Sequence, residues 1–215
     1  MSFSLPRFYA IIDPAKTGGQ SPLEVCDVLL AAGVRLIQYR DKQASSRALF
    51  ANSRIMAERV RRAGGIFIVN DRADVAQAAG AHGVHVGQED LPVEFARRII
   101  GPEGIVGYSI HNLAQLAEAD GSSAEYVAFG PVFATRSKEK PDPVVGLEGL
   151  RAARQATRKP LVAIGGITLE TARAVLEAGA DSLAVISDLL SAPDLAVRAR
   201  EFLQVVGEAP PVMQD

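Results

Sequence analysis

The stretch Tyr126–Lys138, YVAFGPVFATRSK, joins an apolar run to a polar loop. The run Tyr126–Phe129 is typical of a strand in a parallel sheet that is covered on both faces. A Gly-Pro dipeptide then ends the strand. We expect a phosphate site in the loop that follows, with a solvated surface loop as the alternative, because the loop carries two hydroxyls and two cations: Thr135, Arg136, Ser137 and Lys138.

The bulk composition is that of one globular domain. The chain has 215 residues, of which 48% are hydrophobic and 22% charged. Its formal net charge of -2 gives no overall attraction for nucleic acid or an anionic membrane, so we expect neither as a partner. The single cysteine, Cys26, allows no intrachain disulfide and is interpreted as a core residue. No signal peptide or membrane span is visible, and we expect a cytoplasmic protein.

Short apolar runs alternate with helical patterns along the whole chain. Such alternation indicates parallel βαβ units, and about eight of them in this length predict a single-domain (β/α)8 barrel with short loops over residues 1–206. A doubly wound open sheet is the alternative fold, but the sequence lacks its Gly-rich fingerprint after the first strand. The tail 207–215 has little to bury, and we expect it to be disordered. The expected strands are Phe8–Ile12, Val34–Tyr39, Ile66–Val69, Gly83–Val86, Ile105–Tyr108, Tyr126–Phe129, Pro160–Ile164 and Ser182–Ile186.

Charged side chains follow several of these strands, where a barrel of this kind places its active site. Arg40, Lys42 and Lys138 are three cations, which together suit a multiply charged anion. Asp71 and Asp90 would repel that anion unless a hard cation bridges them, and Mg²⁺ takes carboxylate and phosphate oxygens in this way. This side of the rim therefore predicts a Mg²⁺-diphosphate site.

A second group follows the seventh and eighth strands. Gly165 and Gly166 let a backbone approach a ligand closely, and Ser187 can open a short extra helix before the last one. Loops at this position of the barrel often bind a phosphate. The two groups together predict a transferase that uses two phosphorylated small molecules, with pyrophosphate as the leaving group.

A set of short segments resembles the thiamine phosphate synthase family over nearly the whole chain. The family is a (β/α)8 barrel. It joins 4-amino-2-methyl-5-hydroxymethylpyrimidine diphosphate to 4-methyl-5-(2-phosphoethyl)thiazole, or the carboxylated form of this thiazole. The resemblance implies that this chain makes thiamine phosphate and releases pyrophosphate, with Mg²⁺, by a dissociative mechanism. The segments are QYRDK (Gln38–Lys42), VND (Val69–Asp71), GVHVGQEDLP (Gly83–Pro92), GYSIH (Gly107–His111), GPVFATRSK (Gly130–Lys138), AIGGI (Ala163–Ile167) and VIS (Val185–Ser187).

Matching positions imply roles for individual residues. Asp71 and Asp90 would bind Mg²⁺, and the catalytic residues would be Arg40, Lys42, Ser109 and Lys138. The thiazole phosphate would be held by Thr135, Arg136, Ser137, Gly166, Ile186 and Ser187. The pyrimidine diphosphate would be held by Gln38, Tyr39, Arg40, Asp41, Lys42, Asn70, Ser109 and Lys138.

The three histidines are read separately. His82 is interpreted as a helix-end residue, and His111 as a brace for the loop after the fifth strand. His85 has two readings, one in which it faces the pyrimidine and one in which it packs inside the barrel.

Three other functions share parts of this pattern. A thiazole tautomerase needs no diphosphate site, so the presence of Arg40, Lys42, Asp71 and Asp90 argues against it. A catalytically silent thiazole-phosphate-binding paralogue would be expected to lack the two carboxylates first. A barrel isomerase of another kind would need an acid–base pair, for which the rim offers only Asp13 and His111. The sequence does not fix the oligomeric state and leaves a homo-oligomer open.

Overall fold

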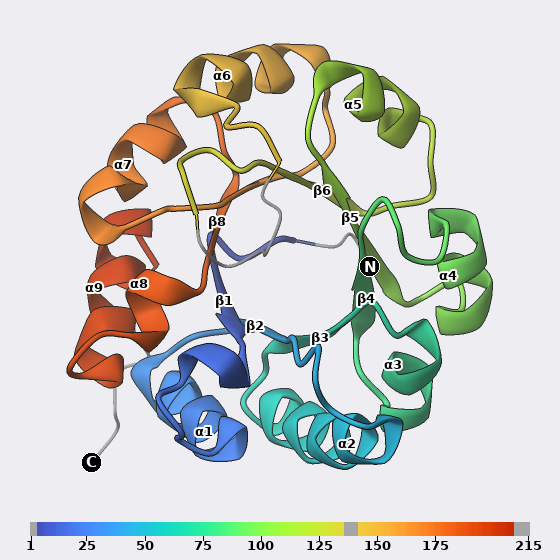
Figure 1. Ribbon diagram of the computed structural model, residues 1–215, viewed down its shortest axis with the longest axis vertical. Coiled ribbons are helices and arrows are strands. Elements are labelled where there is room, and N and C mark those ends of the chain that lie inside the picture. The colour runs from blue at the N-terminus through green and yellow to red at the C-terminus, as the bar shows by residue number, and fades with distance from the viewer. Residues whose placement is uncertain (1–3, 136–141, 209–215) are drawn as a thin grey trace.

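The computed structural model describes residues 4–135 and 142–208, which form a closed barrel of parallel strands inside a ring of helices (Figure 1). The strands pair in chain order, and β8 pairs with β1. The predicted (β/α)8 barrel is therefore confirmed, and the open-sheet alternative is excluded. The strands are β1 (Phe8–Ile12), β2 (Leu36–Tyr39), β3 (Ile66–Asn70), β4 (Gly83–Val86), β5 (Ile105–Ile110), β6 (Tyr126–Phe129), β7 (Leu161–Ile164) and β8 (Ser182–Val185).

Helices cover the outside of the barrel between successive strands (Figure 1). The short extra helix predicted at Ser187 is present as α8, next to α9. A turn of 3-10 helix, Pro14–Lys16, was not predicted; Asp13 caps it by accepting a hydrogen bond from the Ala15 backbone N–H at 3.0 Å. The α-helices are α1 (Pro22–Ala32), α2 (Ser46–Arg62), α3 (Ala73–Ala79), α4 (Val93–Ile100), α5 (Leu113–Asp120), α6 (Gly146–Ala156), α7 (Leu169–Glu177), α8 (Ser187–Leu190) and α9 (Leu195–Val206).

Strands β3 and β5 run further toward the rim than predicted. Ser109 was expected to follow its strand, but it pairs with Ala128 inside the ladder between β5 and β6. Asn70 likewise closes β3, paired with His85. The polar side chains suggested strand ends, yet the mouth of a barrel accommodates polar groups on its inner face. Both residues therefore have their orientation set by the pleat of a strand rather than by a loop.

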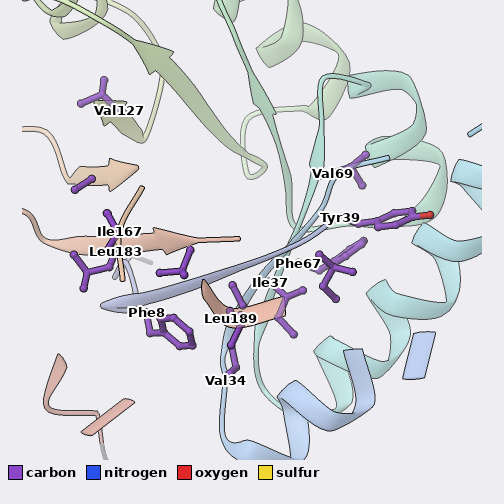
Figure 2. Packing of buried hydrophobic residues seen from close by; sticks show 14 of the residues in the cluster. Phe8, Val34, Ile37, Tyr39, Phe67, Val69, Val127, Ile167, Leu183 and Leu189 are labelled. Atoms are coloured by element: carbon purple, nitrogen blue, oxygen red, sulfur yellow. The ribbon is translucent and has the colours of Figure 1, made fainter. Parts of the chain in front are cut away.

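Alternate residues of the strands build two separate cores. The outer core lies between the strands and the helices, and Figure 2 shows part of it, including Phe8, Ile37 and Phe67. The inner core fills the barrel itself. Because both faces of every strand are buried, the strands read as continuous apolar runs in the sequence. The inner core consists of Tyr9, Ile11, Leu36, Ile68, Tyr126, Ala128, Val162 and Ala184, with partly buried residues packed against them.

The barrel closes where β1 meets β8, and α9 covers that junction. The rings of Phe8 on β1 and Phe202 on α9 stack with centroids 5.0 Å apart, and both are fully buried. Cys26 on α1 is also buried, which confirms it as a core residue, and burial raises the pKa of its thiol to about 12. Gly207 ends α9 and Glu208 accepts a hydrogen bond from the Arg7 backbone N–H; the rest of the predicted tail, 209–215, lies outside the described residues.

Within the described ranges, no helix is both long and apolar enough to cross a membrane.

The packing of α9 over the junction of β1 and β8 predicts that two Phe→Ala variants differ clearly in stability. Phe202→Ala should lower the free energy of unfolding by about 3–5 kcal/mol, because it removes a buried ring and leaves a cavity against Phe8. Phe95→Ala is the matched control, since the Phe95 ring on α4 is 51% exposed and its loss should cost less than about 1 kcal/mol. Urea unfolding followed by circular dichroism measures both values. A loss for Phe202→Ala no larger than that for Phe95→Ala would contradict this view of the closure.

Candidate active site

The loop after β2 brings Arg40 to the mouth of the barrel, where Asp13 holds it. The Arg40 guanidinium forms an ion pair with the Asp13 carboxylate, and the two side chains are 18% and 5% exposed. The Arg40 backbone N–H also donates to the Ile12 carbonyl at 2.9 Å. Sequence reasoning placed Asp13 on the rim but gave it no part in this site. The Asp-Pro pair directly after the first strand was the signal that could have suggested a fixed carboxylate there.

Asp71 and Asp90 converge beside Lys42, as predicted. Lys42 forms an ion pair with Asp71. Asp71 has a backbone φ of +62°, which is uncommon for a residue other than glycine, and its N–H donates to the His85 carbonyl at 2.7 Å. Asp90 accepts a hydrogen bond from the Gly87 N–H at 2.7 Å. Burial, reinforced by the neighbouring Asp71 carboxyl, raises the pKa of Asp90.

This pair of carboxylates fits a hard divalent cation. The raised pKa of Asp90 means that its ionised form is disfavoured beside Asp71, and a bound cation would remove that cost. Within residues 4–135 and 142–208 there is no cluster of three or more His, Cys, Asp or Glu side chains that could hold a metal by itself. Two carboxylates completed by ligand oxygens and water are the arrangement typical of Mg²⁺ sites.

Several predicted residues line the inside of the mouth. The Gln38 amide nitrogen donates to the Tyr9 hydroxyl at 2.7 Å, and the Ser109 hydroxyl lies 2.8 Å from His85 Nε2. Asn70 lies beside His85 at the ends of neighbouring strands. His85 is 94% buried and stacks on Tyr126 with centroids 5.6 Å apart, so its packing inside the barrel is established. Tyr9 and Tyr126 had no predicted role in the site.

Tyr39 and Asp41 hold the loop after β2 in place through hydrogen bonds. Tyr39 is fully buried in the outer core (Figure 2), where its hydroxyl accepts from the Asn52 amide and donates to Asp41. The Asp41 carboxylate also accepts the N–H groups of Gln43 and Ala44 at 3.1 and 3.0 Å. These bonds shape the loop that presents Arg40. Direct contact of Tyr39 and Asp41 with the diphosphate stays a prediction, and the function proposed below does not depend on it.

The second group of predicted residues lies across the ends of β6, β7 and β8. The loop after β6 lies alongside the loop after β7, because the Phe133 N–H donates to the Gly165 carbonyl at 2.9 Å. Gly166 has a φ of +65°, and a Cβ there would lie 2.5 Å from the Ala134 carbonyl oxygen. Thr135 is therefore brought close to Gly166. Ile186 and Ser187 follow β8, the neighbour of β7 in the sheet, while Arg136, Ser137 and Lys138 lie outside the described residues.

His111 braces the loop after β5, as predicted, since its backbone N–H donates to the Gln115 Oε1 at 2.7 Å, and its ring also braces the loop after β6. Its Nδ1 donates to the Gly130 carbonyl at 2.7 Å, and its Nε2 lies 3.4 Å from the Asp142 carboxylate. These partners stand at the start and near the end of the loop after β6, so His111 ties that loop down from outside it. The prediction did not include the contacts with the loop after β6, because that loop is distant from His111 in the sequence.

His82 is not the helix-end residue that the sequence indicated, because α3 is capped at Gly80 and His82 lies directly before β4, where its ring binds β3. Its Nδ1 accepts the Phe67 N–H at 3.0 Å. Burial, reinforced by the nearby Arg61 guanidinium, lowers the pKa of His82, which keeps Nδ1 available as an acceptor.

Comparison with known proteins decides the family. The model of the thiamine monophosphate synthase family matches residues 8–189. The chain belongs to this family. A thiamine-phosphate synthase of Koribacter versatilis is 52% identical over 206 residues, covering 94% of this chain and 96% of the relative. One from Chloroflexus aurantiacus is 42% identical over 200 residues, covering 93% of this chain and 92% of the relative.

Solved structures agree with the family at the level of the fold. Thiamine phosphate pyrophosphorylase from Pyrococcus furiosus superposes with a TM-score of 0.85 at 36% identity, covering 94% of this chain and 96% of that one. A 3-hexulose-6-phosphate synthase has a TM-score of 0.63 at 20% identity, over 94% of this chain and all of that one, and shows the fold alone. Membership of the thiamine monophosphate synthase family makes this chain an enzyme of the transferase class that acts in thiamine biosynthesis.

The pKa of Asp90 predicts how the metal-free protein responds to pH. A carboxyl whose folded-state pKa is raised stabilises the fold below its ordinary pKa of 3.8, and this contribution is lost as the pH rises through the folded value. Asp90→Asn avoids that loss and keeps an acceptor for the Gly87 N–H. In EDTA at pH 7 it should therefore raise the melting temperature, and the gain should shrink as the pH falls toward 4.

Calorimetry between pH 4 and 8 measures this difference. Asp194→Asn is the matched control, because Asp194 also accepts a backbone N–H but caps α9 away from other carboxylates of the site, and Asn caps equally well. Mg²⁺ should stabilise the unsubstituted protein more than the Asp90→Asn variant. If the unsubstituted protein and the Asp90→Asn variant melt at the same temperature in EDTA at pH 7, ionised Asp90 does not destabilise the fold, and the prediction is contradicted.

Proposed function

We propose that this chain couples hydroxymethylpyrimidine diphosphate to thiazole phosphate and releases pyrophosphate; from the carboxylated thiazole it would release CO2 as well. The observation that supports this most strongly is the division of one barrel mouth into two unlike sides. Arg40, Lys42, Asp71 and Asp90 gather at the ends of β2 to β4, whereas Thr135, Gly166 and Ser187 lie in the loops after β6, β7 and β8, on a rim with two adjacent glycines. A reaction between a diphosphate substrate and a monophosphate substrate would use both sides of the mouth, one for each substrate.

The diphosphate side can stabilise a leaving group. Arg40, fixed by Asp13, would bind diphosphate oxygens with its planar guanidinium, and Lys42 would add a second charge. Asp71 and Asp90 would hold Mg²⁺, which when bound supplies positive charge to the diphosphate. Lys138 belongs to the same proposed set. Charge that develops on the departing pyrophosphate is then met by groups already in place, which is the most effective form of electrostatic catalysis.

The side of the mouth that would bind the thiazole phosphate needs to orient this substrate but does not need to activate it chemically. In the proposed reaction the C–O bond to the diphosphate breaks first, pyrophosphate leaves with the bonding electrons, and the thiazole nitrogen donates its lone pair to the resulting pyrimidinylmethyl cation. No proton has to be removed from the attacking nitrogen, so no general base is required. Thr135, Arg136, Ser137, Gly166, Ile186 and Ser187 would bind the thiazole phosphate, and holding the two reactants together would supply much of the rate.

Pyrophosphate release from purified protein tests the proposal. Release should require both substrates and Mg²⁺, and EDTA should abolish it. Asp71→Asn should lower kcat/KM at a fixed Mg²⁺ concentration by about 100-fold, because it removes one of two carboxylate ligands. Asp181→Asn is the control, since Asp181 forms an ion pair with Arg154 before β8, at the other end of the barrel.

Two results would contradict the proposal in different ways. Absence of release while thiazole phosphate still binds would favour the tautomerase or the silent paralogue. Release that continues in EDTA would show that the metal assignment to Asp71 and Asp90 is wrong.

A further inference from the structure

Five polar side chains form one continuous chain of hydrogen bonds through the inside of the barrel. The Gln38 amide nitrogen is 2.7 Å from the Tyr9 hydroxyl, which is 2.9 Å from the Tyr126 hydroxyl. Tyr126 is 3.0 Å from His85 Nδ1, and His85 Nε2 is 2.8 Å from the Ser109 hydroxyl. The two ends of this hydrogen-bonded chain, Gln38 and Ser109, are among the residues that the family resemblance assigns to the pyrimidine diphosphate.

The barrel is built around the middle of this chain. Tyr9, Tyr126 and His85 are 1%, 0% and 6% exposed. A Cβ at Gly107 would lie 2.1 Å from the Tyr126 ring and 2.5 Å from His85 Nδ1, so only glycine leaves room for the contact between them. Polar groups that are buried to this degree are normally hydrogen-bonded, and these bond to one another.

The direction of the hydrogen bonds follows from counting protons. Burial raises the pKa of both Tyr9 and Tyr126, so each phenol keeps its single proton. Tyr9 accepts from the Gln38 amide and so donates to Tyr126, which in turn donates to His85 Nδ1. A neutral imidazole that accepts at Nδ1 carries its proton on Nε2, and this proton goes to Ser109. The Ser109 hydroxyl then has its own proton left for a ligand.

The opposite direction does not satisfy the same geometry. If Tyr126 donated to Tyr9, the Tyr9 oxygen would accept twice, and its own proton would have no acceptor among the residues that the structure describes. The whole chain can reverse only if the Gln38 amide turns over, so that its oxygen faces Tyr9. Ser109 would then donate to His85 and could only accept from a ligand. The orientation of the Gln38 amide therefore determines whether the Ser109 hydroxyl donates a hydrogen bond to a ligand or only accepts one.

We infer that Tyr9, Tyr126 and His85 are positioning residues that fix Gln38 as an acceptor and Ser109 as a donor for the heterocycle of the diphosphate substrate. An aminopyrimidine carries both amine donors and ring-nitrogen acceptors, so it suits one fixed acceptor and one fixed donor. A heterocycle without the exocyclic amine would leave a polar group of the mouth unpaired, and such mismatches discriminate strongly. This inference rests on the proposed function for the identity of the ligand, but the proton arrangement belongs to the protein alone.

Kinetics of two conservative variants test the positioning role. Tyr9→Phe and Tyr126→Phe keep the ring and remove only the hydroxyl that links the chain. Each should lower kcat/KM for the pyrimidine diphosphate by about 10-fold or more while changing KM for the thiazole phosphate by less than about twofold. Each should also reduce the preference over an analogue in which hydrogen replaces the exocyclic amine. Tyr108→Phe is the control, because Tyr108 neighbours Gly107 on β5 but packs against the outer core.

Nitrogen NMR of ¹⁵N-histidine-labelled protein tests the proton arrangement without any substrate. The chain has three histidines, so the His85 signals can be assigned with a His85→Gln variant. We expect the Nε2–H tautomer for His85, and loss of that fixed tautomer in Tyr126→Phe but not in Tyr108→Phe. An Nδ1–H tautomer, or no effect of Tyr126→Phe, would overturn the inference.

The two experiments separate this inference from the proposed function. Active protein in which Tyr9→Phe and Tyr126→Phe leave both kcat/KM and the analogue preference unchanged would overturn the positioning role alone. Protein that releases no pyrophosphate from the two substrates would overturn the proposed function, and with it the pyrimidine as ligand, while the NMR result would still decide the proton arrangement.

Discussion

The parallel pairing of β8 with β1 is the constraint on which the rest of the molecule depends. It joins Phe8, Tyr9 and Ala10 to Leu183, Ala184 and Val185 and so closes the sheet into a barrel. Because every strand runs in the same direction, every carboxyl end reaches the same rim. Residues separated by most of the sequence, such as Asp13 and Ser187, therefore follow neighbouring strands. The two sides of the candidate active site lie at one rim only because the sheet closes in this way.

Closure also divides the strands into two environments, and the inner one is partly polar. The outer face of each strand packs on helices and is almost wholly apolar. The inner face carries mostly Ile, Leu and Ala but also Gln38, His85 and two tyrosines. Buried polar groups cost stability unless each is bonded, and here they bond in one continuous chain. This chain of hydrogen bonds ends at Gln38 and Ser109 in the mouth of the barrel, so the polar part of the core continues directly into the candidate site.

The cations of the mouth are held by carboxylates before any ligand arrives. Asp13 holds Arg40, and Asp71 pairs with Lys42. The first pair is mostly buried, where a lone charge would be costly, so each member fixes the other. Preorganised charges need no rearrangement when a reaction develops charge, which suits the departure of pyrophosphate in the proposed reaction. Asp90 and Asp71 form the opposite arrangement, two like charges kept close, and this makes a cation favourable there.

The sequence allowed the barrel and the composition of the rim to be predicted, but not the contacts across it. Alternating apolar runs and helices gave strand positions because strands buried on both faces leave continuous apolar signals. Ser109 and Asn70 were read as loop residues because a polar side chain inside a barrel looks the same in sequence as one after a strand. Tyr9 and Tyr126, 117 residues apart, read as ordinary core aromatics; only the closed barrel brings their hydroxyls together. The ring contacts of His111 were missed for the same reason, since its partners there, Gly130 and Asp142, lie beyond the next strand.

The division of one mouth into two anion sites is tested most directly by backbone amide NMR of the 22.8 kDa protein during two titrations. Pyrophosphate with Mg²⁺ should shift the amides of Arg40, Lys42, Asp71 and Asp90 and leave those of Gly166 and Ser187 in place. Inorganic phosphate, added afterwards, should then shift Gly166 and Ser187. If both anions shifted the same set of amides, or if pyrophosphate shifted Gly166 and Ser187 first, the mouth would hold a single anion site and the two-substrate arrangement would be contradicted.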